Sequence, residues 1–147
     1  PWDHDGHGTF VSGLIAATWN NDAGIAGINP EAQIMVLKAL NSFGHSRASY
    51  VAEAIAYAAD NGARVINLSV GGPEITTVQR KAVEYAASKG VLIVVAAGNE
   101  GRELEGFGIA AMPQVLTVGA SDRDDDRAGF SNFGPEIDIV SPGVDIV

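Results

Sequence analysis

The sequence contains no cysteine among its 147 residues. Disulfide bridges and thiolate metal sites are therefore excluded, and the fold depends on a hydrophobic core. A chain of this length can bury roughly two-thirds of the surface that its unfolded form exposes, so we expect one domain over residues 1–147. The lack of cysteine does not identify the compartment, because many exported proteins have no disulfides.

Basic residues are also scarce: 9 lysines and arginines stand against 18 acidic residues, which gives a formal net charge of −9. Nucleic acid is therefore not expected as a partner, since phosphate binding requires clustered positive charge. The acidic run at residues 122–126 is interpreted as a solvated turn, because like charges in a block repel and stay hydrated. No stretch approaches the ~20 apolar residues that a membrane span needs, so no membrane partner is expected.

The two ends of the sequence indicate a longer protein. The sequence opens on Pro-Trp-Asp-His-Asp, which has no initiator methionine and is not the pattern of a secretory signal peptide. It closes shortly after a Pro-Gly turn at residues 142–143. We expect both ends to be interruptions of a longer chain.

Four short runs rich in valine, isoleucine and leucine are predicted to be strands. They show little alternation of apolar and polar residues, which is typical of strands that are covered on both faces of a parallel sheet. The runs are residues 34–40, 65–70, 91–97 and 115–120.

Two longer amphipathic segments, residues 49–61 and 77–89, are predicted to be helices. The apolar stripes expected to face inward are Val51, Ile55 and Ala58 in the first and Val78, Val83 and Ala86 in the second. Each segment ends at a glycine, Gly62 or Gly90, which readily adopts the left-handed conformation that stops a helix. Strands alternating with helices predict an α/β fold with a parallel sheet.

A histidine stands at the entrance of a third predicted helix. His7 precedes residues 8–17, an apolar segment in which small side chains recur. A lone histidine is most often a hydrogen-bonded structural residue. However, the glycines on both sides of His7 allow other backbone or a substrate to approach closely, so a role as a catalytic base is also considered.

Two predicted strands lead into glycine turns. Asn99 follows the run 91–97, and its amide could donate hydrogen bonds to an oxygen that becomes negative during a reaction, because ligands gather at the carboxyl ends of parallel strands. Its alternative role is to occupy a left-handed turn position, which asparagine tolerates. After the run 65–70, Gly71 and Gly72 leave backbone bare for pairing with an extended peptide, although a simple strand-to-loop transition explains them equally well.

Taken in order, four motifs resemble successive signatures of the subtilisin-like serine proteases: GHGTFVSG, VINLSVGGP, VVAAGNEG and FSNFGPEIDIVSPG. The resemblance runs from residue 3 to the last residue. It implies a subtilisin-like three-layer α/β sandwich with a mainly parallel sheet, incomplete in this chain. It also implies a serine endopeptidase that forms an acyl-enzyme and acts on extended polypeptides.

The resemblance implies roles for individual residues. His7 matches the base of the catalytic triad, and Asn99 matches the side-chain donor of the oxyanion hole. The two are expected to converge on one small void that fits a nucleophilic hydroxyl. The residues that match the substrate-pairing strand and the floor of the specificity pocket are Ser69, Val70, Gly71, Ala97 and Gly98. Glu100 lies next to that pocket, which suggests a modest preference for basic side chains.

Two motifs of the family do not occur in the sequence: the Gly-Thr-Ser-Met-Ala type that carries the nucleophile and the Asp-Thr/Ser-Gly type that carries the triad aspartate. We therefore expect the 147 residues alone to be inactive and the catalytic protein to be the longer one. The loop at residues 102–113 also departs from the Tyr-Pro loop of many relatives, so the shape of the specificity pocket is not predicted.

No cofactor is expected for catalysis, and a structural calcium ion is considered. Residues 19–25 resemble the loop that many subtilisins wrap around calcium, with the Asn21 side chain and nearby backbone carbonyls as oxygen ligands.

Two other functions are left open: a non-catalytic subtilase-like domain that binds peptides at residues 69–71, and a small ligand-binding module with an anion site at residues 98–101. The second lacks the Gly-x-Gly-x-x-Gly turn of dinucleotide-binding proteins. A secreted or extracellular location is expected from most relatives, although an acidic, cysteine-free chain also fits the intracellular ones. Self-association of the 147 residues is expected as well, because an incomplete sheet exposes apolar surface.

Overall fold

The computed structural model describes residues 2–146, and the chain forms two compact units, residues 1–47 and residues 48–146. The first unit carries the helix α1 (His7–Ala16), as the sequence predicts. After α1 the chain turns back on itself: the N–H groups of Gly27 and Ile28 donate to the carbonyls of Ala17 and Leu14 at 3.0 and 2.9 Å. Gly27 is buried in this turn, and an added Cβ would lie only 2.3 Å from the backbone nitrogen of Ala17.

The prediction of a strand at residues 34–40 is wrong. Within residues 2–146 this run pairs with no strand, and Ile34, Met35 and Val36 are 41%, 41% and 60% exposed. An extended run becomes a strand only where a neighbour supplies a ladder of backbone hydrogen bonds. The apolar pattern indicates that the run favours an extended conformation, but it does not indicate whether a neighbouring strand is present.

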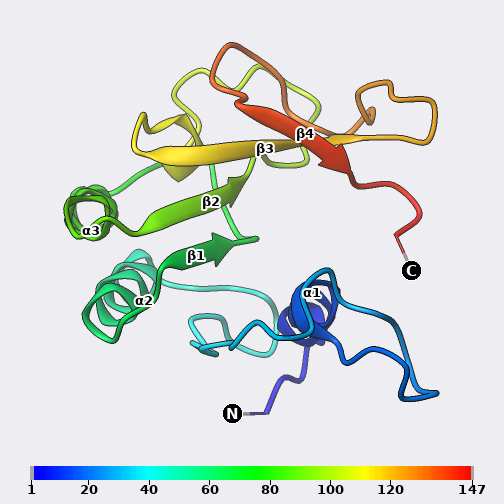
Figure 1. Cartoon of the computed structure of the whole chain (residues 1–147). Coiled ribbons are helices and arrows are strands. Elements are labelled where there is room, and N and C mark those ends of the chain that lie inside the picture. Colours follow the sequence, from blue (N-terminus) through cyan, green and yellow to red (C-terminus); the bar gives the residue numbers. More distant parts are fainter. Residues whose placement is uncertain (1, 147) are drawn as a thin grey trace. The chain divides into compact units, whose positions relative to one another are not determined.

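The second unit is built on a four-stranded parallel sheet in the order β1-β2-β3-β4 (Figure 1). Its strands are β1 (Val65–Leu68), β2 (Leu92–Ala96), β3 (Val115–Ser121) and β4 (Ile139–Pro142). The α/β fold with a parallel sheet is therefore confirmed. The strand β4 is not among the predicted runs, and all four of its residues are exposed.

Helices α2 (Ala48–Asp60) and α3 (Thr77–Ser88) lie side by side in this unit (Figure 1). Thr76 starts α3 with a capping box: its hydroxyl accepts from the N–H of Gln79, and the Gln79 side chain accepts from the N–H of Thr76. The glycines that follow the helices, Gly62 and Gly90, have φ of +84° and +78°, as predicted. The sequence thus encodes the start of α3 and the ends of both helices.

The inward stripe of α2 is confirmed, since Val51, Ile55 and Ala58 are buried. In α3 the stripe consists of Ala82, Val83 and Ala86 instead. Val78 is 47% exposed, so its predicted burial is wrong. Burial of α3 begins one turn later than its apolar pattern suggests, because residues 2–146 leave Val78 in the first turn of the helix exposed.

Within residues 48–146, the residues of β1 and β2 alternate between covered and exposed. Ile66 and Ile93 are 9% and 0% exposed, whereas Val65 and Leu92 are 57% and 46% exposed. Successive residues of a strand point to opposite faces, so this unit by itself covers one face of β1 and β2, and coverage of both faces stays a prediction. No helix in the described part of the chain is long and apolar enough to span a membrane.

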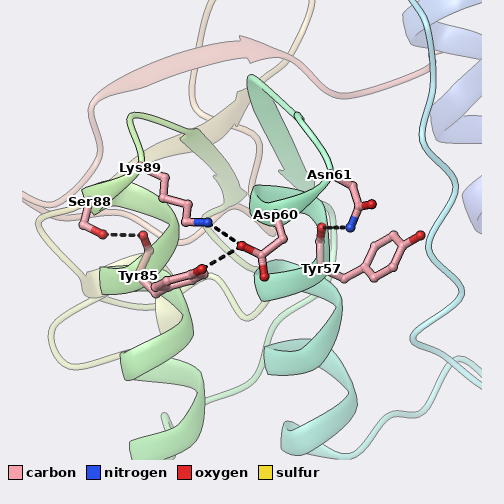
Figure 2. Close-up of polar contacts among 6 residues, drawn as sticks. All are labelled: Tyr57, Asp60, Asn61, Tyr85, Ser88 and Lys89. Atoms are coloured by element: carbon pink, nitrogen blue, oxygen red, sulfur yellow. Dashed lines mark hydrogen bonds and ion pairs between the residues drawn. The ribbon is translucent and has the colours of Figure 1, made fainter.

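A polar cluster joins the C-terminal ends of α2 and α3 (Figure 2). Asp60 pairs with the ammonium group of Lys89 and accepts a hydrogen bond from the Tyr85 hydroxyl at 2.6 Å. The Lys89 nitrogen also lies 4.7 Å from the centre of the Tyr85 ring. The hydrogen bond to Lys89, and then that to Tyr85, lowers the pKa of Asp60, and the same bond to Asp60 raises the pKa of Lys89.

We predict that Asp60→Asn destabilises the protein in a pH-dependent way. A carboxyl whose pKa is lowered by folding stabilises the folded state above its ordinary range and loses that effect as pH falls through the lowered value. Chemical denaturation should therefore show wild type as more stable than Asp60→Asn near pH 7, with the difference shrinking below about pH 4. The matched variant Glu53→Gln changes an exposed carboxyl in the middle of α2 and should leave the stability nearly unchanged. A difference between wild type and Asp60→Asn that does not change with pH would contradict the prediction.

Candidate active site

A cavity of about 310 Å³ opens in the second unit at the carboxyl ends of the strands. Its walls come from the last residues of all four strands and from the loops that follow them: Asn67, Ser69, residues 94–99, residues 118–120, Ser131 and residues 141–143. In open parallel sheets this edge is the usual place for a ligand, because the loops after the strands converge there. Polar side chains and bare glycine backbone lie together on the wall of this cavity.

The loop after β2 brings Ala97, Gly98 and Asn99 to the cavity, as the sequence predicts for a site at the end of this strand. Ala97 is 2% exposed, and Gly98 has a φ of +100°, a conformation that favours glycine. Asn99 is exposed, and its carboxamide has no hydrogen-bond partner among residues 2–146. Its two N–H donors are therefore available to a ligand in the cavity.

A residue that the sequence analysis did not single out, Asn132, fixes this loop. Asn132 is 1% exposed. Its amide nitrogen donates to the carbonyl of Ala97 at 2.9 Å and to Oε2 of Glu100 at 2.8 Å. Its amide oxygen accepts from the N–H groups of Glu100 and Arg102, both at 3.1 Å.

The Asn132 amide also explains why position 98 is a glycine. A Cβ added to Gly98 would lie 2.5 Å from Nδ2 of Asn132 and 2.7 Å from Oε2 of Glu100. Both distances are shorter than real contacts, so any side chain at position 98 would displace the amide or the carboxylate. Asn132 belongs to the motif FSNFG, but only the folded chain shows that its side chain reaches across to residues 97–102.

The predicted substrate-pairing residues follow the end of β1, which is two residues shorter than predicted. Ser69 and Val70 are half-buried and Gly71 is exposed. Ser69 lines the cavity, and its Oγ accepts a hydrogen bond from Nδ2 of Asn67 at 2.9 Å. β1 is the outer strand of the described sheet, so the backbone beside these residues is placed for the addition of an extended peptide.

The loop at residues 102–113 is a packed part of this unit. Leu104 and Phe107 are 0% and 4% exposed, and the short helix η1 (Ile109–Ala111) is largely buried. Gly108 lies against the turn after β1, because an added Cβ would be 2.1 Å from the carbonyl oxygen of Gly72. This loop therefore packs against the turn at Gly72, which directly follows residues 69–71. Its sequence does not show this, because the contact is between two backbones.

His7 lies in the first unit, at the start of α1. The helix is capped from a distance by Asp3: Oδ1 accepts from the N–H of Gly6 at 3.0 Å, and Oδ2 accepts from the N–H and the hydroxyl of Thr9 at 2.8 and 2.7 Å. These bonds fix the turn on both sides of His7. His7 and Asn99 belong to different units, and their convergence on one void stays a prediction.

The loop proposed for calcium also lies in the first unit. Asn20, Asp22 and Gly24 all have positive φ, of +54°, +55° and +67°, so residues 20–24 curl tightly. Oδ1 of Asn21 accepts from the N–H of Ala23 at 3.2 Å, which leaves one of its two lone pairs for another partner. A tight loop with amide, carboxylate and carbonyl oxygens fits the ligand preference of calcium. Within residues 2–146 no group of three or more His, Cys, Asp or Glu side chains is arranged to hold a metal ion.

We predict that Asp3→Asn loosens the turn that carries His7. The bonds from Thr9, and then that from Gly6, lower the pKa of Asp3 to about 2. Because the pKa is lowered by folding, the stabilisation is present above about pH 4 and is lost as pH falls to about 2. Hydrogen exchange at the N–H groups of Gly6 and Thr9 should be faster in the variant at neutral pH.

Asp5→Asn is the matched control for this prediction. Among the described residues Asp5 accepts one bond, which is longer, from the N–H of His7 at 3.3 Å, so its replacement should change the exchange at Gly6 and Thr9 far less. Equal effects of Asp3→Asn and Asp5→Asn would show that Asp3 has no special capping role.

Comparisons with known proteins indicate one family. The model of a family described as the Subtilase family matches residues 1–146. The chain is 48% identical over 147 residues to the thermophilic serine proteinase of Bacillus sp. (strain AK1), covering 36% of that protein. It is 40% identical over 144 residues to subtilisin BL of Lederbergia lenta, covering 53% of that protein. The chain thus spans between a third and about half of the length of these relatives.

A solved structure described as proteases from Pseudoalteromonas arctica has the same fold. The match has a TM-score of 0.85 at 31% sequence identity, and it covers 90% of this chain and 42% of the other. The chain, with its parallel four-stranded sheet, therefore has the subtilisin fold over nine-tenths of its length.

Proposed function

The chain belongs to the Subtilase family, and on this premise we propose that the full-length protein that contains it is a serine endopeptidase. The proposed reaction is hydrolysis of a peptide bond through an acyl-enzyme, and the proposed substrate is an extended polypeptide. The relatives named above are called serine proteinase and subtilisin. Because the chain spans only part of their length, the nucleophilic serine and the triad aspartate are proposed to come from the rest of the protein.

The observation that carries this proposal is that the Asn99 side chain lies on the cavity wall with its hydrogen-bond donors unused by the described chain. Its carboxamide is exposed on the wall of the cavity and is without a partner in the described chain, while residues on both sides of it are hydrogen-bonded to Asn132. An amide held in this way can donate to an oxygen that gains negative charge without first breaking another bond. Preorganised donors of this kind are usually the largest electrostatic contribution to acyl transfer.

In the proposed reaction His7 is the general base. Its imidazole takes the proton of the serine hydroxyl as the oxygen attacks the substrate carbonyl, and later gives that proton to the leaving amine. The carbonyl oxygen becomes negative in the tetrahedral intermediate, and Asn99 donates a hydrogen bond to it. A water molecule then hydrolyses the acyl-enzyme with the same base and the same donor.

The remaining predicted residues are proposed to hold the substrate. The backbone of Ser69, Val70 and Gly71 would pair with the peptide, and Ala97 with Gly98 would form the floor of the specificity pocket. The Glu100 carboxylate lies close above Gly98, since Oε2 is 2.7 Å from the position of an added Cβ. A negative charge at this place supports the proposed preference for basic side chains.

The alternative, a non-catalytic peptide-binding domain, is favoured by the open outer edge of β1 beside residues 69–71. It shares the proposed substrate with the enzyme but predicts no covalent chemistry. The secreted or extracellular location and the self-association of the isolated 147 residues stay predictions.

We predict that a fluorophosphonate probe labels the full-length protein and that His7→Ala abolishes the labelling, because the serine hydroxyl then has no base to remove its proton. Asn99→Ala should lower kcat for a peptide substrate by about 10²–10³-fold, the loss already known for an oxyanion-hole asparagine in this family.

Asn61→Ala is the matched control, because Asn61 is an exposed asparagine at the end of α2 whose amide donates to the carbonyl of Tyr57 (Figure 2). It should leave labelling and kcat unchanged. A protein that binds extended peptides but is not labelled would favour the binding domain over the enzyme.

We also propose that residues 19–25 bind a structural calcium ion through Asn21 and backbone carbonyls. Calcium should raise the Tm of the wild-type protein relative to the chelated protein, and Asn21→Ala should remove most of that increase. Asn41→Ala is the matched control, since Asn41 makes a similar turn by accepting from the N–H groups of Phe43 and His45. Equal responses of the two variants to calcium would contradict the proposal.

A further inference from the structure

We infer that Asn132 is a positioning residue for the oxyanion donor: its buried carboxamide holds residues 97–102 in the single conformation that presents Asn99 to the cavity. The inference rests on the proposed function of Asn99 and adds to it a residue with no place in the catalytic triad. It is carried by the geometry of the contacts between two segments that lie more than thirty residues apart in the sequence.

The hydrogen-bonding capacity of the Asn132 side chain is used completely. A carboxamide has two donors and two acceptor lone pairs. The donors go to the Ala97 carbonyl and the Glu100 carboxylate, and the lone pairs go to the N–H groups of Glu100 and Arg102. One side chain therefore holds the Ala97 carbonyl, the Glu100 carboxylate and two backbone N–H groups together, and it makes all four bonds in this conformation of the loop.

The bonds bracket Asn99. Ala97 precedes it by two residues, and Glu100 and Arg102 follow it. The backbone N–H of Asn132 adds a fifth bond, to the carbonyl of Gly98 at 3.2 Å. Asn132 therefore fixes the chain immediately before and immediately after Asn99 while leaving the Asn99 side chain without a bond in the described chain.

Asn132 can act in this way because its own segment is anchored. The guanidinium group of Arg127 donates to the Ser131 carbonyl at 2.6 Å and lies 4.8 Å from the centre of the Phe133 ring. The Ser131 hydroxyl accepts from the N–H of Ala120 on β3 at 3.0 Å and donates to the Asn132 carbonyl at 3.0 Å. The hydrogen bond between Ser131 and Ala120 thus anchors Asn132 to strand β3 of the sheet.

Three further backbone contacts join the segments. The N–H of Gly101 donates to the Phe130 carbonyl at 2.8 Å, the N–H of Phe133 donates to the Arg102 carbonyl at 3.0 Å, and the N–H of Leu104 donates to the Phe133 carbonyl at 2.7 Å. These bonds would persist without the Asn132 side chain and would keep residues 101–104 in place. Because the N–H of Ala97 is also bonded, to the Val118 carbonyl at 2.9 Å, the part of the loop that depends on the carboxamide is residues 98–100, which includes Asn99.

If Asn132 acts through Asn99, its loss should affect the transition state and not the binding of substrate. Displacement of a catalytic group by about 1 Å can lower the rate about 10²-fold. We expect Asn132→Ala in the full-length protein to lower kcat about 10- to 100-fold with little change in KM. In an Asn99→Ala background the same substitution should cause no further loss of kcat, because the group that it positions is already absent.

Thr117→Val is the matched control. Thr117 is 1% exposed, its hydroxyl donates to the Ala110 carbonyl at 2.6 Å, and it does not line the cavity. Its replacement also removes a buried hydrogen bond, so it should lower the stability of the protein while leaving kcat unchanged. Should Asn132→Ala not fold, Asn132→Asp takes its place: it keeps both acceptors for Glu100 and Arg102, loses the donors, and sets a second carboxylate against that of Glu100, which also releases the loop.

A second readout is independent of activity. Hydrogen exchange at the N–H of Glu100 should be slow in the wild type and in Thr117→Val and fast in Asn132→Ala. A wild-type protein that is inactive on peptides but shows this exchange pattern would contradict the proposed function and support the positioning of the loop.

Three results would overturn the inference. The first is that the N–H of Glu100 exchanges as slowly in Asn132→Ala as in the wild type. The second is that Asn132→Ala raises KM and leaves kcat unchanged. The third is that Asn132→Ala lowers kcat by the same factor in the wild-type and Asn99→Ala backgrounds.

Discussion

The buried carboxamide of Asn132 is the interaction on which the geometry of the candidate site depends. A typical hydrogen bond contributes only about 1 kcal/mol to stability, but a buried polar group left without a partner costs about 1–3 kcal/mol. Asn132 satisfies the Ala97 carbonyl and the N–H groups of Glu100 and Arg102. A conformation of the loop that moves these groups away would leave the Asn132 carboxamide, which is 1% exposed, without them. The cost of leaving the Asn132 carboxamide without partners therefore determines the conformation of the loop as much as the bonds themselves do. The same amide also requires glycine at position 98, because it occupies the space that a Cβ would need.

The parallel sheet determines where this network lies. All four strands run in one direction, so the loops that follow them meet at one edge and enclose the cavity there. β3 supports Asn132 through Ser131, and β2 leads directly into the loop that Asn132 holds. Gly108 braces the turn after β1 in a similar way, by backbone contact with Gly72. Rigid strands thus carry the loops, and a few buried contacts between loops determine their shape.

The sequence predicts the elements of the second unit well, because their signals are local. The helices α2 and α3 follow from apolar periodicity and from glycine stops, and the position of Asn99 follows from the rule that sites lie at the ends of parallel strands. The failures concern features that depend on a partner. Residues 34–40 have the composition of a strand but no neighbouring strand within residues 2–146, and β4 is too short and too exposed to have an apolar signal.

The same distinction applies to the candidate site. His7, Asn99 and Ser69 are predicted from motifs, because each motif is continuous in the sequence. Asn132 and Asp3 cannot be given their roles in this way, since each acts on residues that only the folded chain brings within reach. Residues proposed to carry chemistry are thus easier to predict from a sequence than residues that hold them in position.

The most direct test of the central claim is a crystal structure of the full-length protein with a peptide boronate, which forms a tetrahedral adduct with a catalytic serine. We predict that one boronate oxygen lies 2.7–3.1 Å from Nδ2 of Asn99. In the same complex the other face of the adduct should lie within hydrogen-bonding distance of the His7 imidazole, with the Asn132 amide still bonded to Ala97 and Glu100. A boronate bound elsewhere, or an Asn99 side chain turned away from it, would contradict the assignment of this cavity as an active site.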